Sequence, residues 1–143
     1  MATKIPKITL ILFFAFLLRF WNISRLPSLN PDEAALGYNA YSLLETGKDE
    51  HGIAWPLHFK SFGDYKPGGY VYLAMPFVKV FGLTPFAVRL PNLIFSLLTI
   101  YFLYHLVLLL TNNYLLSNLT AIVLAVNPWH LQFSRGAWES STA

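Results

Sequence analysis

The sequence predicts an all-α membrane protein: three transmembrane helices plus a helical extracytoplasmic loop lying on the membrane surface. Two observations carry this prediction. The 143 residues are 55% hydrophobic and only 12% charged, with a mean hydropathy of +0.48, whereas a soluble domain is about one quarter charged. Apolar residues also gather in three stretches, at about residues 5–23, 90–110 and 114–133. A helix of about 20 residues spans the hydrocarbon core of a bilayer.

The first stretch has two interpretations. Lys4 and Lys7 precede an apolar run that ends at Leu18, as in a signal peptide. Arg19 follows this run without a small-residue cleavage site, which favours an uncleaved helix with the guanidinium reaching toward the interface at its outer end. The two lysines predict a cytoplasmic N-terminus. Residues 24–89 would then lie outside.

The second and third stretches predict a helical hairpin. The second carries no formal charge, and Pro91 suits a helix start because its missing N–H costs nothing there. Thr111-Asn112-Asn113 is a short polar break between the two stretches. If the first helix leads outward, the third leads outward again, so its end lies on the side of the outer loop.

The outer loop, residues 24–89, contains too many aromatic and apolar residues for a flexible linker. Asn30-Pro31-Asp32-Glu33 has the pattern of a helix start, in which Asn30 caps and Glu33 bonds back to the cap. Ala34, Tyr38 and Tyr41 then give this helix an apolar face. Gly47 is expected to end it. A second apolar segment, Tyr70 to Leu83, is too short to span easily and predicts an interfacial helix.

Four side chains are the candidates for chemistry. Asp32 and Glu33 either only complement the dipole of the helix they begin, or one of them is a general base at a membrane-facing site. Lys66, within Asp64-Tyr65-Lys66-Pro67, is either an exposed turn lysine or an anion contact near the head groups. Arg135 is either an interface anchor or, on the predicted topology, a cation on the same side as the other three.

Several classes of site are excluded by composition. The chain has no cysteine, so it has no disulfide and no thiolate metal site. Its four histidines show no metal-ligand spacing, and no metal-ligating residues are assigned. The ten basic residues are scattered, which argues against nucleic acid as a partner.

A series of short motifs extends along nearly the whole chain: Arg19-Phe20, Pro31-Asp32-Glu33-Ala34, Asp64-Tyr65-Lys66-Pro67, Phe81-Gly82, Val88-Arg89-Leu90-Pro91, Asn127-Pro128 and Ser134-Arg135. Together they resemble the N-terminal part of the transmembrane domain of GT-C membrane glycosyltransferases. The closest type is the protein O-mannosyltransferase and aminoarabinose-transferase superfamily. Residues 1–143 would form this portion.

The resemblance implies a multi-pass enzyme of the cell membrane. It would transfer a sugar from a polyprenyl-phosphate donor, with inversion, to a hydroxyl or other nucleophile of an acceptor protein or glycan on the outer face. Asp32 would be the catalytic base with Glu33 as a neighbouring acid, and Lys66 and Arg135 would bind the lipid phosphate. Cations are useful there because the leaving group is a phosphate. Membrane lipid would be the further partner.

The chain also departs from the family pattern. Gly68 stands where a second proline often follows the Lys-Pro pair, and Tyr65 stands where some members place an acid. A divalent metal is therefore a possible cofactor, but no residue is assigned as its ligand. The chain is shorter than such enzymes, so we expect an amino-terminal fragment that is inactive alone. The alternatives are a non-catalytic accessory or assembly protein and a transporter fragment, the latter disfavoured because paired broken helices are missing.

Overall fold

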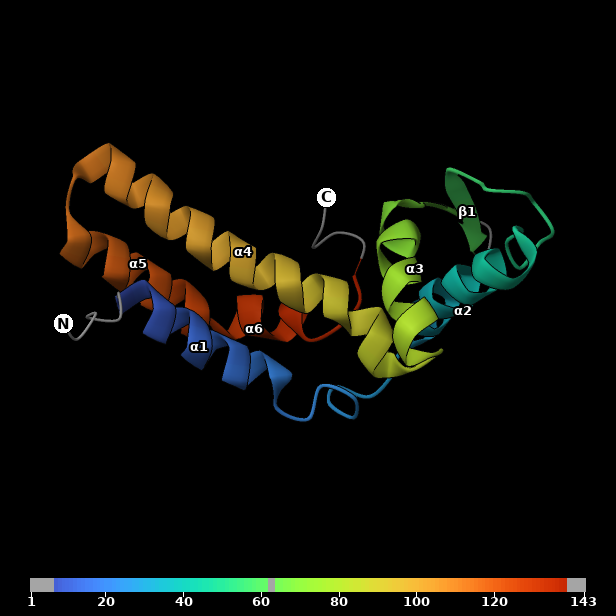
Figure 1. Cartoon of the computed structure of the whole chain (residues 1–143), viewed down its shortest axis with the longest axis horizontal. Helices are drawn as coiled ribbons and strands as arrows, with labels where there is room; N and C mark the ends of the chain where they lie inside the picture. Colours follow the sequence, from blue (N-terminus) through green and yellow to red (C-terminus); the bar gives the residue numbers. More distant parts are fainter. Residues whose placement is uncertain (1–6, 62–63, 139–143) are drawn as a thin grey trace.

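The computed structural model describes residues 7–61 and 64–138, which form an elongated molecule with two parts (Figure 1). The first part, the bundle, contains α1 (Lys7–Phe20), α4 (Pro85–Thr111), α5 (Tyr114–Val126) and the short α6 (Pro128–Ser134). The second part, the cap, contains α2 (Pro31–Thr46), β1 (His58–Ser61), β2 (Asp64–Pro67) and α3 (Gly69–Phe81). The cap lies at the end of the bundle where α1 finishes and α4 begins.

Small side chains allow the three long bundle helices to pack closely. Ala15, Ala121 and Ala125 are fully buried, and Ile100 and Tyr104 of α4 pack with them. Close approach at small residues is the usual way in which helices associate in a lipid environment. The outward faces of α4 and α5 carry large exposed apolar side chains, among them Phe102, Leu109 and Val123.

Only one membrane span is supported by helix length within the described residues. α4 has 27 residues, and an 18-residue stretch of it has a mean hydropathy of 2.3, so it is long and apolar enough to cross a bilayer. α5 has 13 residues, which reach about 20 Å. The third stretch does not continue to residue 133 as one helix, because Asn127 and Pro128 end α5 and begin α6. The prediction of three spans is therefore not confirmed.

The start of α4 differs from the prediction, and its end agrees with it. Thr84 caps the helix by accepting a hydrogen bond from the Ala87 N–H, and Pro85 occupies the first turn, so Pro91 lies inside the helix instead of at its start. The Thr84-Pro85 pair is the stronger start signal because it supplies both a cap and a preset φ. The helical hairpin is confirmed, with Asn112 in the left-handed conformation.

In the cap, the predicted start and end of α2 are confirmed. The Glu33 N–H donates to Asn30 Oδ1 at 2.8 Å, and Gly47 ends the helix with φ 71°. The prediction that Tyr38 and Tyr41 lie on the apolar face is wrong, however, since both side chains are exposed. The buried face is instead formed by Leu36, Ala40 and Leu43, which pack on α3.

The all-α prediction also missed a two-stranded antiparallel sheet. β1 and β2 pair with Phe59 opposite Lys66, and the buried Phe59 side chain anchors the sheet in the cap core. Four-residue strands are too short for an alternating pattern to stand out in the sequence. α3 follows directly and agrees with the segment predicted as interfacial, ending before Gly82.

Candidate active site

Asp32 and Lys66 meet in an ion pair at the start of α2. Lys66 Nζ lies 2.5 Å from Asp32 Oδ1, and the two side chains are 22% and 46% exposed, respectively. Asp32 follows Pro31 in the first turn of α2, and Lys66 is held on β2 opposite Phe59. The sequence places these residues 34 positions apart. The pair therefore forms an accessible carboxylate with a cation in direct contact.

Gly68 helps to fix the strand that carries Lys66. Its N–H donates to the Leu57 carbonyl at 2.8 Å. A Cβ at this position would lie 2.8 Å from the same oxygen and 2.6 Å from Cε2 of Phe59. A proline here would lack the N–H donor. Glycine in place of the second proline of the motif is thus matched to the hairpin that this chain forms.

Glu33 has a different environment from Asp32. Its carboxylate is buried and accepts two hydrogen bonds from Arg89, at 2.8 and 2.7 Å. It also accepts from the N–H of Ala137 at 2.6 Å and from the N–H of Asn30 at 3.3 Å. Arg89 in turn donates to the carbonyl of Ile23 at 2.7 Å. This buried network joins the α1–α2 linker, α2, α4 and the segment after α6.

Arg135 lies at the same end of the molecule as Asp32. Its Nη2 donates to the carbonyl of Trp21 at 2.6 Å and to that of Leu26 at 3.4 Å. Because Ala137 binds Glu33, the segment 135–137 packs against the start of α2. The hydrogen bonds of Arg135 go to the linker and not to Asp32. The structure thus joins Asp32 with Lys66 and brings Arg135 to the linker that leads to α2.

Two buried arginines were not identified as structural centres from the sequence. The sequence predicted that the Arg19 side chain reaches toward the interface. This prediction is wrong, because the guanidinium is fully buried. It donates to the carbonyls of Ala15 and Ala125 and lies 2.8 Å from Nδ1 of His130. Ala15 lies one turn earlier in α1, but Ala125 and His130 come from a distant part of the chain, as does the carboxylate that binds Arg89. No local pattern in the sequence marks such pairs.

Tyr70 of α3 links the cap to α4 by a hydrogen bond. Its phenol donates to the carbonyl of Val88 at 2.8 Å. Burial raises the pKa of Tyr70 above its usual value, so the hydroxyl remains a donor at alkaline pH. This bond fixes α3 against the first turns of α4.

The described residues do not provide a metal centre. No group of three or more His, Asp or Glu side chains that would hold an ion is found in residues 7–61 and 64–138. Asp32, the accessible carboxylate, is paired with a lysine. The described donor set therefore does not fit a divalent cation.

One protein-family model matches a stretch of the chain that contains all four candidate residues. A family model described as dolichyl-phosphate-mannose-protein mannosyltransferase matches residues 9–138, which include Asp32, Glu33, Lys66 and Arg135. Neither the curated proteins nor the solved structures contain a significant match. The resemblance inferred from the motifs is confirmed by the family model. The chain belongs to the dolichyl-phosphate-mannose-protein mannosyltransferase family, a family of membrane-associated glycosyltransferases.

Proposed function

We propose that the cap carries the base and part of the phosphate-binding site of a glycosyltransferase that uses a polyprenyl-phosphate-linked sugar. The observation that carries the proposal is the direct contact between Asp32 and Lys66 on an accessible edge of the cap. Transfer from a lipid phosphate needs a proton acceptor for the incoming hydroxyl and a cation for the departing phosphate. These are the two kinds of group that the contact supplies.

In the proposed reaction the acceptor hydroxyl gives its proton to the carboxylate of Asp32 while its oxygen attacks the anomeric carbon. The bond between this carbon and the phosphate oxygen breaks on the opposite side, so the configuration is inverted. The polyprenyl phosphate leaves with the bonding electrons and gains negative charge. Lys66 and Arg135 stabilise that charge, as fixed cations do at developing anions.

The ion pair suggests an order of events. Without the donor, Lys66 is bound to Asp32. An arriving phosphate offers Lys66 a second anionic partner, and the exchange frees the carboxylate to accept a proton. Arg135 is already held by two carbonyl groups through Nη2. Its remaining donors are the ones proposed to reach the phosphate.

For Glu33 we propose a positioning role in place of the catalytic one expected from the sequence. Each of its two oxygens already accepts two hydrogen bonds, and its side chain is buried. A group in this state cannot easily exchange protons with a substrate. It holds the first turn of α2, and with it Asp32, against α4.

We also propose the sidedness. α1 runs toward the cap, α4 begins beside the cap, and α6 leads the chain from the end of α5 toward it, while the turn between α4 and α5 lies at the other end. With the N-terminus in the cytoplasm, the cap and its site face outward. The family match does not favour the alternative of a non-catalytic accessory protein.

The test is sugar transfer by the protein expressed from its complete gene, with polyprenyl-phosphate mannose as the donor. Asp32→Asn keeps the shape of the side chain, and we expect transfer to fall by about 100-fold or more, as for the loss of a general base. Glu45→Gln is the matched control, because Glu45 is an exposed acid on the same helix. Near-normal transfer by Asp32→Asn rejects the proposed function.

A further inference from the structure

The bundle contains a cavity that the proposed reaction does not use. It has a volume of about 790 Å³ and lies between α4, the end of α5 and α6. Nine residues line it: Asn92, Ser96, Thr99, Leu124, Asn127, Trp129, His130, Phe133 and Ser134. None of these side chains is acidic or a permanent cation. Six of them are polar, so the cavity can offer hydrogen-bonding groups to a polar occupant.

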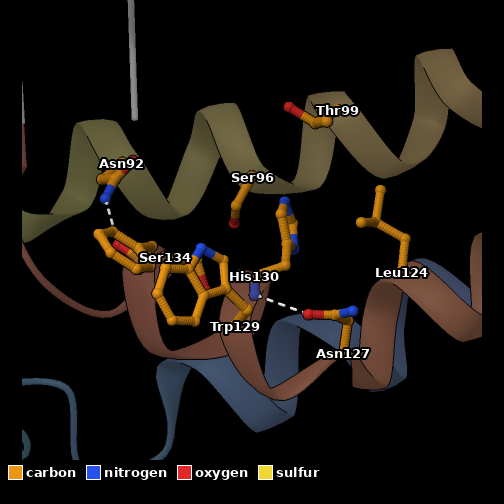
Figure 2. A pocket seen from close by; sticks show the side chains of 9 residues that line it. Asn92, Ser96, Thr99, Leu124, Asn127, Trp129, His130 and Ser134 are labelled. Carbon is orange, nitrogen blue, oxygen red and sulfur yellow. Dashed lines mark hydrogen bonds between the residues drawn. The ribbon is translucent and has the colours of Figure 1, made fainter. Parts of the chain in front are cut away.

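The orientation of donors and acceptors in this cavity follows from the contacts. Arg19 has only donors, so Nδ1 of His130, at 2.8 Å from Arg19 Nη2, must be the acceptor. The hydrogen of the neutral ring is then on Nε2, which points away from Arg19. The buried guanidinium thereby fixes His130 as a donor. Figure 2 shows the ring of His130 extending from α6 toward α4, beside Ser96.

The hydroxyl groups supply acceptors. Ser96 donates its proton to the carbonyl of Leu93 at 2.7 Å, and Ser134 donates to that of Leu131 at 2.8 Å. Their oxygen lone pairs remain for another partner. The oxygens of a carboxylate or of an ionised phosphate are mainly acceptors and would meet these lone pairs unfavourably. A sugar hydroxyl both donates and accepts, so it matches the serine oxygens and the His130 N–H alike.

An aromatic platform completes the lining. The indole of Trp129 is 75% exposed, and it is drawn beside the cavity on the α6 side in Figure 2. Its ring lies against that of Phe133, with centroids 5.0 Å apart. A large flat apolar surface of this kind can cover the C–H face of a sugar ring while polar groups bind its hydroxyls.

We propose that the cavity between α4 and α6 is a carbohydrate-binding site for a neutral sugar ring, with Trp129 as its platform and Ser96 and His130 as its hydrogen-bonding groups. Arg19 acts as a positioning residue, since it sets the tautomer of His130. The site does not depend on the proposed reaction, because Asp32, Lys66 and Arg135 do not line it. The choice of a mannoside as the probe rests on the family.

The test measures binding of methyl α-D-mannopyranoside to the protein from the complete gene, by saturation-transfer NMR. The protein is held in phosphatidylcholine nanodiscs, because the head groups of maltoside detergents would compete. We expect wild-type binding, and a loss of affinity of about two- to tenfold in Ser96→Ala, the effect of one hydrogen bond. Ser117→Ala is the control, since Ser117 is also buried and bonds within its own helix but lies outside the cavity.

A second pair of variants changes exposed side chains instead of buried ones. Trp129→Leu removes the platform, and Trp21→Leu removes an equally exposed indole, also 75% exposed, that does not line the cavity. We expect only Trp129→Leu to weaken binding. Absence of wild-type binding, equal affinities in both tryptophan variants, or displacement of the mannoside by inorganic phosphate would overturn the proposal. Retained binding by Asp32→Asn with normal transfer would reject the proposed reaction but not this site.

Discussion

Replacing Glu33 with glutamine removes the charge of the buried carboxylate and keeps its shape. Glutamine has one side-chain oxygen, so the amide nitrogen must take the place of Oε1 or Oε2. At Oε1 it meets the donors of Arg89 and Ala137, and at Oε2 it meets those of Arg89 and Asn30. In either orientation two donors lose their acceptor, and one of them belongs to a buried guanidinium.

The size of the effect follows from these contacts. A hydrogen bond to a charged group contributes about 1.5–3 kcal/mol, and removal of one partner from a buried ion pair costs about 3–5 kcal/mol. We therefore expect Glu33→Gln to lower the free energy of unfolding by about 3–5 kcal/mol. Asp32→Asn makes the same chemical change one residue earlier in an accessible pair, for which we expect less than about 1 kcal/mol.

The assay is unfolding of the full protein in mixed detergent micelles, followed by tryptophan fluorescence, with transfer activity measured in parallel. Glu33→Gln should be destabilised, whereas Asp32→Asn should be stable and inactive. Combining Glu33→Gln with Arg89→Met should cost less than the sum of the two, by about 2 kcal/mol, since the residues are in contact. Equal stability losses for Glu33→Gln and Asp32→Asn, or additivity in the double variant, would refute the assignment of separate roles.

Three further predictions concern the cap. Tyr70→Phe should cost about 1 kcal/mol, because the Val88 carbonyl loses its donor. Since burial raises the pKa of Tyr70, the unfolded chain ionises first, and wild-type stability should fall as pH rises above about 10. Unfolding measured at a series of pH values should show this loss of stability in the wild type and not in Tyr70→Phe. Gly68→Pro should destabilise the hairpin and lower donor affinity through Lys66, measured as an increased KM, whereas Gly69→Ala, where a Cβ meets nothing within 4 Å, should not. Gly37→Ala should lower the melting temperature, as its Cβ would lie 2.7 Å from Cγ2 of Val88, an overpacking cost of about 1–3 kcal/mol.

The features that could be predicted from the sequence are those with local causes. Asn30 and Glu33 form a capping box within four residues, Gly47 supplies a left-handed end, and Asn112 closes the helical hairpin. Each of these requires only neighbouring residues. The same holds for α3, whose apolar run is bounded by Gly69 and Gly82.

The features that could not be predicted depend on partners far along the chain. Arg89 binds a carboxylate 56 residues away, and Arg19 binds groups more than 100 residues away. Tyr38 and Tyr41 have helical spacing, yet the smaller Ala40 faces the core because α3 packs closely there. For the candidate site, the motifs predicted Asp32 and Lys66 as functional residues. Only the fold shows that the carboxylate of Asp32 is accessible whereas that of the adjacent Glu33 is buried.

The central claim is that the cap and the end of α6 lie on one side of the membrane and the α4–α5 turn on the other. Because the chain has no cysteine, single cysteines at Lys48, Asn112 and Gln132, all exposed, can be labelled with a membrane-impermeant maleimide in intact cells. The account predicts labelling of the Lys48→Cys and Gln132→Cys variants, with Asn112→Cys labelled only after permeabilisation. Labelling of Lys48→Cys and Gln132→Cys from opposite sides would contradict it.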